Sequence, residues 1–310
     1  MSKNRSALRN HVEFAAFRLA RGLTGWLPPA GLAKVGDVLG NFYAALPGRR
    51  RRIIDFNLRL AFEDMPDDER RALARAVTRH FARSALDAIR IQRLRPEELL
   101  AAVDVVGGEN IERALSHGRG VFFLTGHIGS WEVAALVTGL KLEGGLSVVN
   151  RPLDNPLLEV EIDQLRKLYG NRVFGKRNMV REMLTKLKRG GGVGILIDQK
   201  VRPDQGVEVP FFGHPAWTHP VLARFVRRTG APVVPIFGYW DVPARYTMAF
   251  GEPVKADGLD PNELQEEPLK HAFVAIRRHE DTAMRCGLDR HPSSFFALSY
   301  VSAAKGLILT

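Results

Sequence analysis

The chain has 310 residues, of which 45% are hydrophobic and 25% are charged, so it can bury a large core and is not a disordered chain. Lysine and arginine number 45 against 34 acidic residues, and the net charge of +11 indicates an anionic partner: nucleic acid, anionic lipid headgroups or an acidic carrier protein. The single cysteine, Cys286, excludes an intramolecular disulfide and a cysteine-based zinc cluster, and is typical of a reducing compartment.

Apolar stretches mark the N-terminal 46 residues, at positions 12–17, 23–27 and 35–46. Charged residues interrupt them before any reaches the roughly 20 residues of a membrane-spanning helix. The pattern predicts an amphipathic segment that lies on a membrane, and the basic run at residues 48–52 suits anionic headgroups. A soluble helical hairpin with a solvated basic turn is the alternative.

The pattern of apolar residues changes along the rest of the chain. Residues 50–100 have apolar side chains at three- and four-residue intervals, which predicts helices with a break at 65–68. From about Val103, short β-rich runs alternate with helical patterns. The runs span residues 121–124, 146–149, 193–197, 233–237 and 246–250. We expect an α/β fold with a mixed, mostly parallel sheet flanked by helices, and a helical, membrane-associated N-terminal region.

This pattern divides the chain into three parts. Residues 1–100 form the helical, membrane-associated region, and residues 101–260 form the α/β core. Residues 261–310 form a C-terminal helix followed by an atypical apolar tail.

A histidine and a carboxylate follow the apolar run at 121–124: His127 and Glu132. On one continuous helix the two side chains would point about 140° apart, so they can meet only if a helix begins between them. Ser130 is a suitable N-cap for a helix over 131–140, and glycines at 126 and 129 relax the preceding turn. We therefore expect His127 to be a general base with Glu132 orienting it. The alternative is a helix-capping histidine and a glutamate that favours the helix dipole.

Other polar residues follow predicted strands, at the sheet edge where ligands bind in open α/β folds. Asn150 and Arg151 follow one strand and Asp198 another, and Arg177 and Arg181 precede a helix. We predict that these five residues bind substrate, the arginines through a phosphate or carboxylate. Loop arginines that bond to backbone carbonyls, or a solvated basic face, are the alternatives.

The chain lacks the residues that several other catalytic mechanisms require. The chain has no Gly-x-Ser-x-Gly elbow, and Cys286 lies in a charged tail without a recognisable histidine partner, which disfavours covalent catalysis. His214 and His219 lack a third ligand in a metal-binding pattern, so we expect neither a metal nor a cofactor. A histidine with an orienting acid and no nucleophile favours direct deprotonation of a substrate hydroxyl, which then attacks an activated acyl group.

Five motifs, in order, resemble those of the late acyltransferases of bacterial lipid A biosynthesis, within the wider His-x4-acid glycerolipid acyltransferase superfamily. They are Gly126-His127-x4-Glu132, residues 150–156, Lys176-Arg177-Asn178 with Arg181, Ile197-Asp198-Gln199, and residues 209–213 with Ala216 and Thr218. The resemblance runs to about residue 255. The C-terminus departs from the family, because the usual tryptophan-containing close is replaced at residues 277–281 and an unrelated apolar tail follows.

The resemblance implies an enzyme on the cytoplasmic face of the inner membrane. It would move a fatty acyl chain from acyl carrier protein to a hydroxyl of a phosphorylated glycolipid, the lipid A precursor, with His127 as base and Glu132 orienting it. The alternatives are an acyl-CoA-dependent glycolipid or lysophospholipid acyltransferase, and a membrane-surface protein of the same fold without activity. Because nothing in the chain resembles a base-stacking module or a recognition helix, we expect no nucleic-acid partner.

Overall fold

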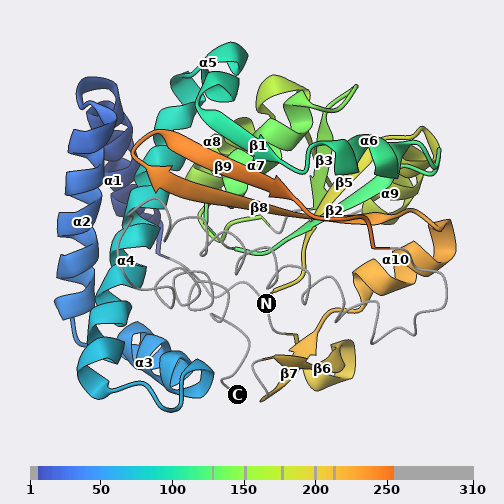
Figure 1. Ribbon diagram of the computed structural model, residues 1–310. Coiled ribbons are helices and arrows are strands. Elements are labelled where there is room, and N and C mark those ends of the chain that lie inside the picture. Colours follow the sequence, from blue (N-terminus) through green and yellow to red (C-terminus); the bar gives the residue numbers. More distant parts are fainter. Residues whose placement is uncertain are drawn as a thin grey trace.

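The computed structural model of the chain describes residues 6–254, apart from residues 128, 150–151, 176–177, 199–200 and 212–213 (Figure 1). The C-terminal segment predicted at 261–310 therefore lies outside the described residues. So do Asn150, Arg151 and Arg177 among the predicted site residues.

Helices alone make up the N-terminal part of the described chain. They are α1 (Ala7–Trp26), α2 (Pro29–Ala45), α3 (Arg49–Ala61), α4 (Asp67–Arg90), the 3-10 turn η1 (Ile91–Arg93) and α5 (Pro96–Ala101). The helices predicted for residues 50–100 are confirmed, with their break just before Asp67. The helices α1, α2 and α4 stand together at one end of the sheet (Figure 1). None of the helices in the described ranges combines the length and apolarity needed to cross a bilayer.

Glycines bring α2 and α4 into close contact. Gly36 and Gly40 lie one turn apart on α2 and face α4. A Cβ atom on Gly40 would lie 2.6 Å from the backbone nitrogen of Arg79 and 2.7 Å from the carbonyl oxygen of Thr78. Because real Cβ contacts are not that short, only glycine allows this approach of the two helices.

A seven-stranded sheet forms the centre of the described chain, in the order β1-β9-β8-β2-β5-β3-β4. Its strands are β1 (Val103–Val106), β2 (Val121–Thr125), β3 (Leu146–Val149), β4 (Arg172–Phe174), β5 (Gly192–Leu196), β8 (Val233–Val242) and β9 (Arg245–Phe250). All neighbouring pairs are parallel except β8 with β9. The mixed, mostly parallel sheet predicted from the sequence is confirmed. The strand β8 extends beyond the predicted 233–237 because its second half pairs with β9.

Helices cover both faces of this sheet. They are α6 (Glu109–Leu115), α7 (Trp131–Leu140), α8 (Pro156–Arg166), α9 (Met179–Lys188) and α10 (Val221–Thr229), with 3-10 turns η2 (Leu168–Gly170) and η3 (Pro203–Gln205). Every residue of β2 is buried, and its alternate side chains enter two separate hydrophobic cores. Val121 and Phe123 pack with α7 and α8, whereas Phe122 and Leu124 pack with α9 and α10. A strand buried on both faces is what the continuous apolar run predicts.

Polar contacts hold the N-terminal helices to the α/β core. On α4, Asp87 accepts a hydrogen bond from the hydroxyl of Tyr246 on β9, and Arg90 contacts both groups at 2.8 and 3.0 Å. Burial is the largest cause that raises the pKa of Tyr246, so its hydroxyl stays a donor at neutral pH. On α1, Arg21 forms a 2.7 Å ion pair with Glu161 of α8.

A separate antiparallel hairpin follows β5, formed by β6 (Val207–Phe211) and β7 (His214–Thr218). None of the strands predicted from the sequence covers these residues, so the hairpin adds to the predicted strands. Pro210 and Pro215 oppose each other across the two strands, and a two-stranded edge tolerates them. The ring nitrogen Nε2 of His214 lies 3.2 Å from the carbonyl oxygen of Leu60, so the hairpin touches the end of α3.

We predict that Gly40→Ala lowers the free energy of unfolding by about 1–3 kcal/mol, because the added methyl group pushes α2 away from α4. Thermal unfolding of the purified protein measures the change. Gly22→Ala on α1 is the matched control, since a Cβ atom there meets nothing within 4 Å. It should stabilise the helix by roughly 0.5–1 kcal/mol. Equal effects of the two substitutions would contradict close packing of α2 on α4.

Candidate active site

His127 lies two residues beyond the end of β2, beside Asp198, which lies two residues beyond the end of β5. Its backbone N–H donates to Oδ2 of Asp198 at 2.7 Å, and its ring nitrogen Nδ1 lies 3.0 Å from Oδ1. The Asp198 side chain is buried, whereas 28% of the His127 side chain is exposed. Because a carboxylate accepts hydrogen bonds, Nδ1 carries the proton, and the imidazole lone pair is on Nε2.

The glycines around His127 permit this geometry. A Cβ atom on Gly126 would lie 3.1 Å from the Asp198 carboxylate, so a larger residue would press on the group that holds the histidine. Gly129 has a positive φ of 55° and forms a bridge with Gly238 of β8. The backbone N–H of Ser130 donates to the carbonyl of Gly238 at 2.9 Å. The turn between β2 and α7 is therefore fastened to the neighbouring strand.

The helix α7 begins at Trp131 with Ser130 as its N-cap residue, as the sequence predicts. Glu132 nevertheless binds a different partner from the one predicted. Its carboxylate accepts from Nη2 of Arg166 on α8 at 2.8 Å, and both side chains are largely buried. The carboxylate that the structure brings to the His127 ring is that of Asp198, from the end of the adjacent strand.

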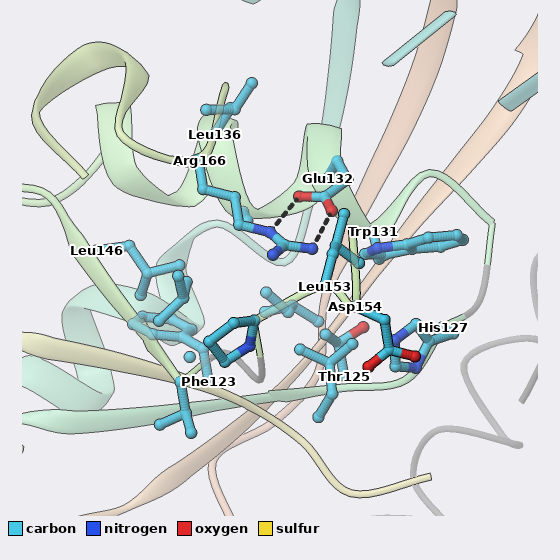
Figure 2. Close-up of a pocket in the computed structure, with 17 residues that line it drawn as sticks. Phe123, Thr125, His127, Trp131, Glu132, Leu136, Leu146, Leu153, Asp154 and Arg166 are labelled. Atoms are coloured by element: carbon cyan, nitrogen blue, oxygen red, sulfur yellow. Dashed lines mark hydrogen bonds and ion pairs between the residues drawn. The ribbon is translucent and has the colours of Figure 1, made fainter. Parts of the chain in front are cut away.

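A pocket of about 500 Å³ is lined by His127 and by the Glu132–Arg166 pair (Figure 2). His127 lies at one side of it, and the Glu132–Arg166 pair lies at another. Apolar side chains from β2, α7, β3 and β8 form much of the wall: Phe123, Leu136, Leu146, Val148 and Ile236. The Nη1 atom of Arg166 is buried and has no hydrogen-bond partner within the described structure. The pocket thus combines an apolar interior with an imidazole and a guanidinium group at its wall.

The loop before α8 supplies another wall of the pocket, through Leu153 and Asp154 (Figure 2). Asn155 follows them and is buried, and its side chain accepts from the backbone N–H of Leu157 at 3.1 Å. The same amide donates to the carbonyl of Asn10 at 3.1 Å and to Glu13 at 3.0 Å, both on α1. Helix α1 therefore holds this edge of the pocket in place.

The structure separates the predicted site residues into groups. His127 and Asp198 are in contact, and Glu132 lines the same pocket as His127. Arg181 is exposed on α9 and lines a different hollow, with Asn178, Lys188 and Arg228. Arg166 lines the pocket although the sequence analysis did not select it. Its position at the end of an amphipathic helix resembles that of an ordinary solvated arginine, and only the apolar residues around it in space distinguish it.

Comparisons with known proteins identify the family of this chain. The family model described as bacterial lipid A biosynthesis acyltransferase matches residues 2–267. The chain therefore belongs to this family, and it is an acyl-transferring enzyme.

Individual relatives support the assignment. The chain is 28% identical over 213 residues to the lipid A biosynthesis lauroyltransferase of Escherichia coli, covering 67% of this chain and 68% of the relative. It is 25% identical over 240 residues to the lipid A biosynthesis myristoyltransferase of the same organism, covering 73% of each. The lipid A biosynthesis acyltransferase 2 of Shigella flexneri is 24% identical over 217 residues, covering 69% of this chain and 68% of the relative.

We predict that His127 is the Nδ1–H tautomer in the native protein, because Asp198 accepts its ring proton. Nitrogen-15 NMR of labelled protein, with two-bond proton correlations, distinguishes the two tautomers. In Asp198→Ala the preference should be lost, while the signals of the exposed His117 stay unchanged. An Nε2–H tautomer in the unmodified protein would contradict the arrangement described above.

Proposed function

We propose that the enzyme transfers a fatty acyl chain from acyl carrier protein to a hydroxyl of a lipid A precursor. The observation that supports this most directly is the His127–Asp198 pair at the mouth of a largely apolar pocket. A base beside an apolar pocket suits a reaction in which a hydroxyl attacks a fatty thioester. The family and the names of the relatives supply the lipid A precursor as acceptor.

In the proposed reaction, Nε2 of His127 takes the proton of the acceptor hydroxyl as its oxygen attacks the thioester carbon. A tetrahedral intermediate forms with a negative charge on the former carbonyl oxygen. The carbon–sulfur bond then breaks, and the thiolate takes the proton from the imidazolium. Asp198 orients the imidazole and stabilises its charged form, which is the role that the sequence analysis gave to Glu132.

Glu132 has a different role in this proposal. It fixes the Arg166 guanidinium at the pocket wall through the 2.8 Å ion pair. The Arg166 side chain lines the same pocket as His127, so its guanidinium supplies a positive charge at the pocket wall. A fixed positive charge at the wall of a largely apolar pocket favours the negative charge that develops on the thioester during the reaction, because apolar surroundings screen charges weakly. Asn150, Arg151, Arg177 and Arg181 remain predicted contacts to the phosphorylated parts of the substrates.

The charge and surface of the chain suit the other proposed partners. The net charge of +11 favours both an acidic carrier protein and an anionic membrane surface. We place the enzyme at the cytoplasmic face of the inner membrane, held there through the helical region 1–100 and carrying its chemistry in the core 101–260. Exposed apolar residues of α1, among them Leu8, Val12 and Leu19, support this attachment.

The first test measures acyl transfer by the full chain, in detergent, from acyl carrier protein to a tetra-acylated lipid A precursor. We expect His127→Ala to lower kcat by about 10²–10⁴-fold, because the reaction then lacks its base. Asp198→Ala should lower kcat in the same direction, and Glu132→Gln should do so without changing the His127 tautomer.

Controls separate the competing functions. The exposed His117→Ala should transfer at the rate of the unmodified chain. Retention of more than about a tenth of the rate by His127→Ala would exclude its role as base. Faster transfer from acyl-CoA than from acyl carrier protein would replace the proposed donor. No transfer from either donor to this acceptor would contradict the proposed reaction.

The second test concerns the pocket. We expect Ala135→Phe to shift the preferred donor toward shorter acyl chains, because Ala135 on α7 lines the pocket beside Leu136. The ratio of kcat/KM for long and short donors should fall by about tenfold or more, since each excluded methylene forfeits about 0.8 kcal/mol of burial. Ala72→Phe, at an exposed position of α4, is the matched control. An unchanged ratio in Ala135→Phe would place the acyl chain elsewhere.

A further inference from the structure

A second large cavity lies between α2, α3 and α4. Its lining residues are distant in sequence from those of the His127 pocket. Its volume is about 610 Å³, and it shares no lining residue with the His127 pocket. Six arginines and two aspartates line it: Arg51, Arg52, Arg59, Arg70, Arg71 and Arg75, with Asp55 and Asp67. The proposed reaction uses none of these residues. We call this hollow the arginine cavity.

The two aspartates already have partners. Arg70 is buried, and its guanidinium contacts Asp67, Asp55 and the carbonyl of Met65. Arg59 lies 3.1 Å from Asp55 and 3.7 Å from Asp67. Both carboxylates are therefore shared between the two arginines, of which only Arg70 is buried.

The other four arginines of the cavity have no such partner. Among the residues that the structure describes, no carboxylate lies within ion-pair distance of Arg51, Arg52, Arg71 or Arg75. Arg71 and Arg75 are one turn apart on α4, and Arg51 and Arg52 lie in the first turn of α3. The cavity therefore gathers uncompensated guanidinium groups from two helices, which is the arrangement that binds phosphate oxygens through paired hydrogen bonds.

Large apolar side chains stand exposed on the helix that borders this cavity. On α2, 64% of Phe42 and 40% of Tyr43 are exposed, and Leu46 directly after the helix is 46% exposed. Tyr43 itself lines the cavity. The exposed apolar surface continues on α1, where Trp26 is 91% exposed. Apolar and aromatic side chains beside arginines are the composition of a membrane-interface surface.

We propose that the arginine cavity binds the phosphate group of an anionic membrane phospholipid while the exposed side chains of α2 enter the acyl boundary. The occupant is a phospholipid because the arginines that can bind a phosphate group lie beside exposed apolar side chains of α2. A phospholipid likewise has a phosphate group next to its acyl chains. This inference rests on the proposed membrane attachment, and it assigns that attachment a defined headgroup site in addition to general charge attraction.

The experiment measures flotation of the full chain with vesicles of phosphatidylcholine alone or mixed with phosphatidylglycerol. We expect the double variant Arg71→Glu/Arg75→Glu to bind the mixed vesicles at least about tenfold more weakly than the unmodified chain. The matched control is Arg224→Glu/Arg227→Glu, with two exposed arginines on α10, across the sheet from the N-terminal helices (Figure 1). It changes the net charge equally and should alter binding by less than about twofold.

A conservative variant distinguishes a site from diffuse attraction. Arg71→Lys/Arg75→Lys keeps both charges but removes the forked donors, so it should weaken binding several-fold if the cavity holds a phosphate group. Full binding by this lysine variant would overturn the site. Equal losses of vesicle binding in Arg71→Glu/Arg75→Glu and in the α10 control would also overturn the site, because general electrostatic attraction would then explain the binding.

The acyl transfer assay in detergent separates this inference from the proposed function. A rise in the KM for acyl carrier protein in Arg71→Glu/Arg75→Glu, as large as the loss of vesicle binding, would assign the surface to the carrier and overturn the lipid site. Acyl transfer by an unmodified chain that binds neither kind of vesicle would overturn the lipid site and leave the enzyme's activity standing. Circular dichroism of each variant verifies that it is folded.

Discussion

The register between β2 and β5 is the constraint on which the site depends. Thr125 pairs with Leu196, and His127 and Asp198 each lie two residues beyond that pair. Parallel strands end at the same edge of a sheet, so equal offsets bring the two side chains together. Because side chains alternate along a strand, a slip of one residue would turn the carboxylate away from the imidazole. The two hydrophobic cores fix this register, since β2 buries alternate side chains in each of them.

The glycines at the ends of these strands complete the constraint. The Asp198 carboxylate occupies the space next to Gly126 that a side chain would need. Gly129 has a positive φ and lies against the backbone of Gly238. The chain then turns at once into α7, so Glu132 lies in the first helical turn and faces α8 and Arg166. One short turn thereby directs two ionisable side chains of the same motif to two different partners. The imidazole and the guanidinium come to opposite parts of one pocket without competing for a carboxylate.

Local patterns allowed the sequence to predict much of this arrangement. The apolar runs predicted β2, β3, β5, β8 and β9, and Ser130 predicted the start of α7, because these features depend on residues close in the chain. The short edge strands β1 and β4 were not predicted. The partner of His127 depends on strand order, which periodicity does not record: β2 lies beside β5, although β3 follows it in the chain. Arg166 was missed for the same reason, since its contact with Glu132 spans 34 positions. The β6–β7 hairpin was missed because Pro210 and Pro215 are residues that usually argue against a strand.

The N-terminal helices link the proposed membrane surface to the pocket by direct contacts. Helix α1 binds the Asn155 side chain, which follows the pocket residues Leu153 and Asp154, and it pairs with α8 through Arg21. Helix α4 is held to β9 by the buried Asp87–Tyr246 contact, while α2 packs on α4 through glycines. These contacts are buried or partly buried, so a surface docked on α1 and α2 keeps a fixed position relative to His127. The packing of these helices would then set the distance between His127 and the membrane surface. A lipid acceptor that stays in its bilayer would meet the base at that distance.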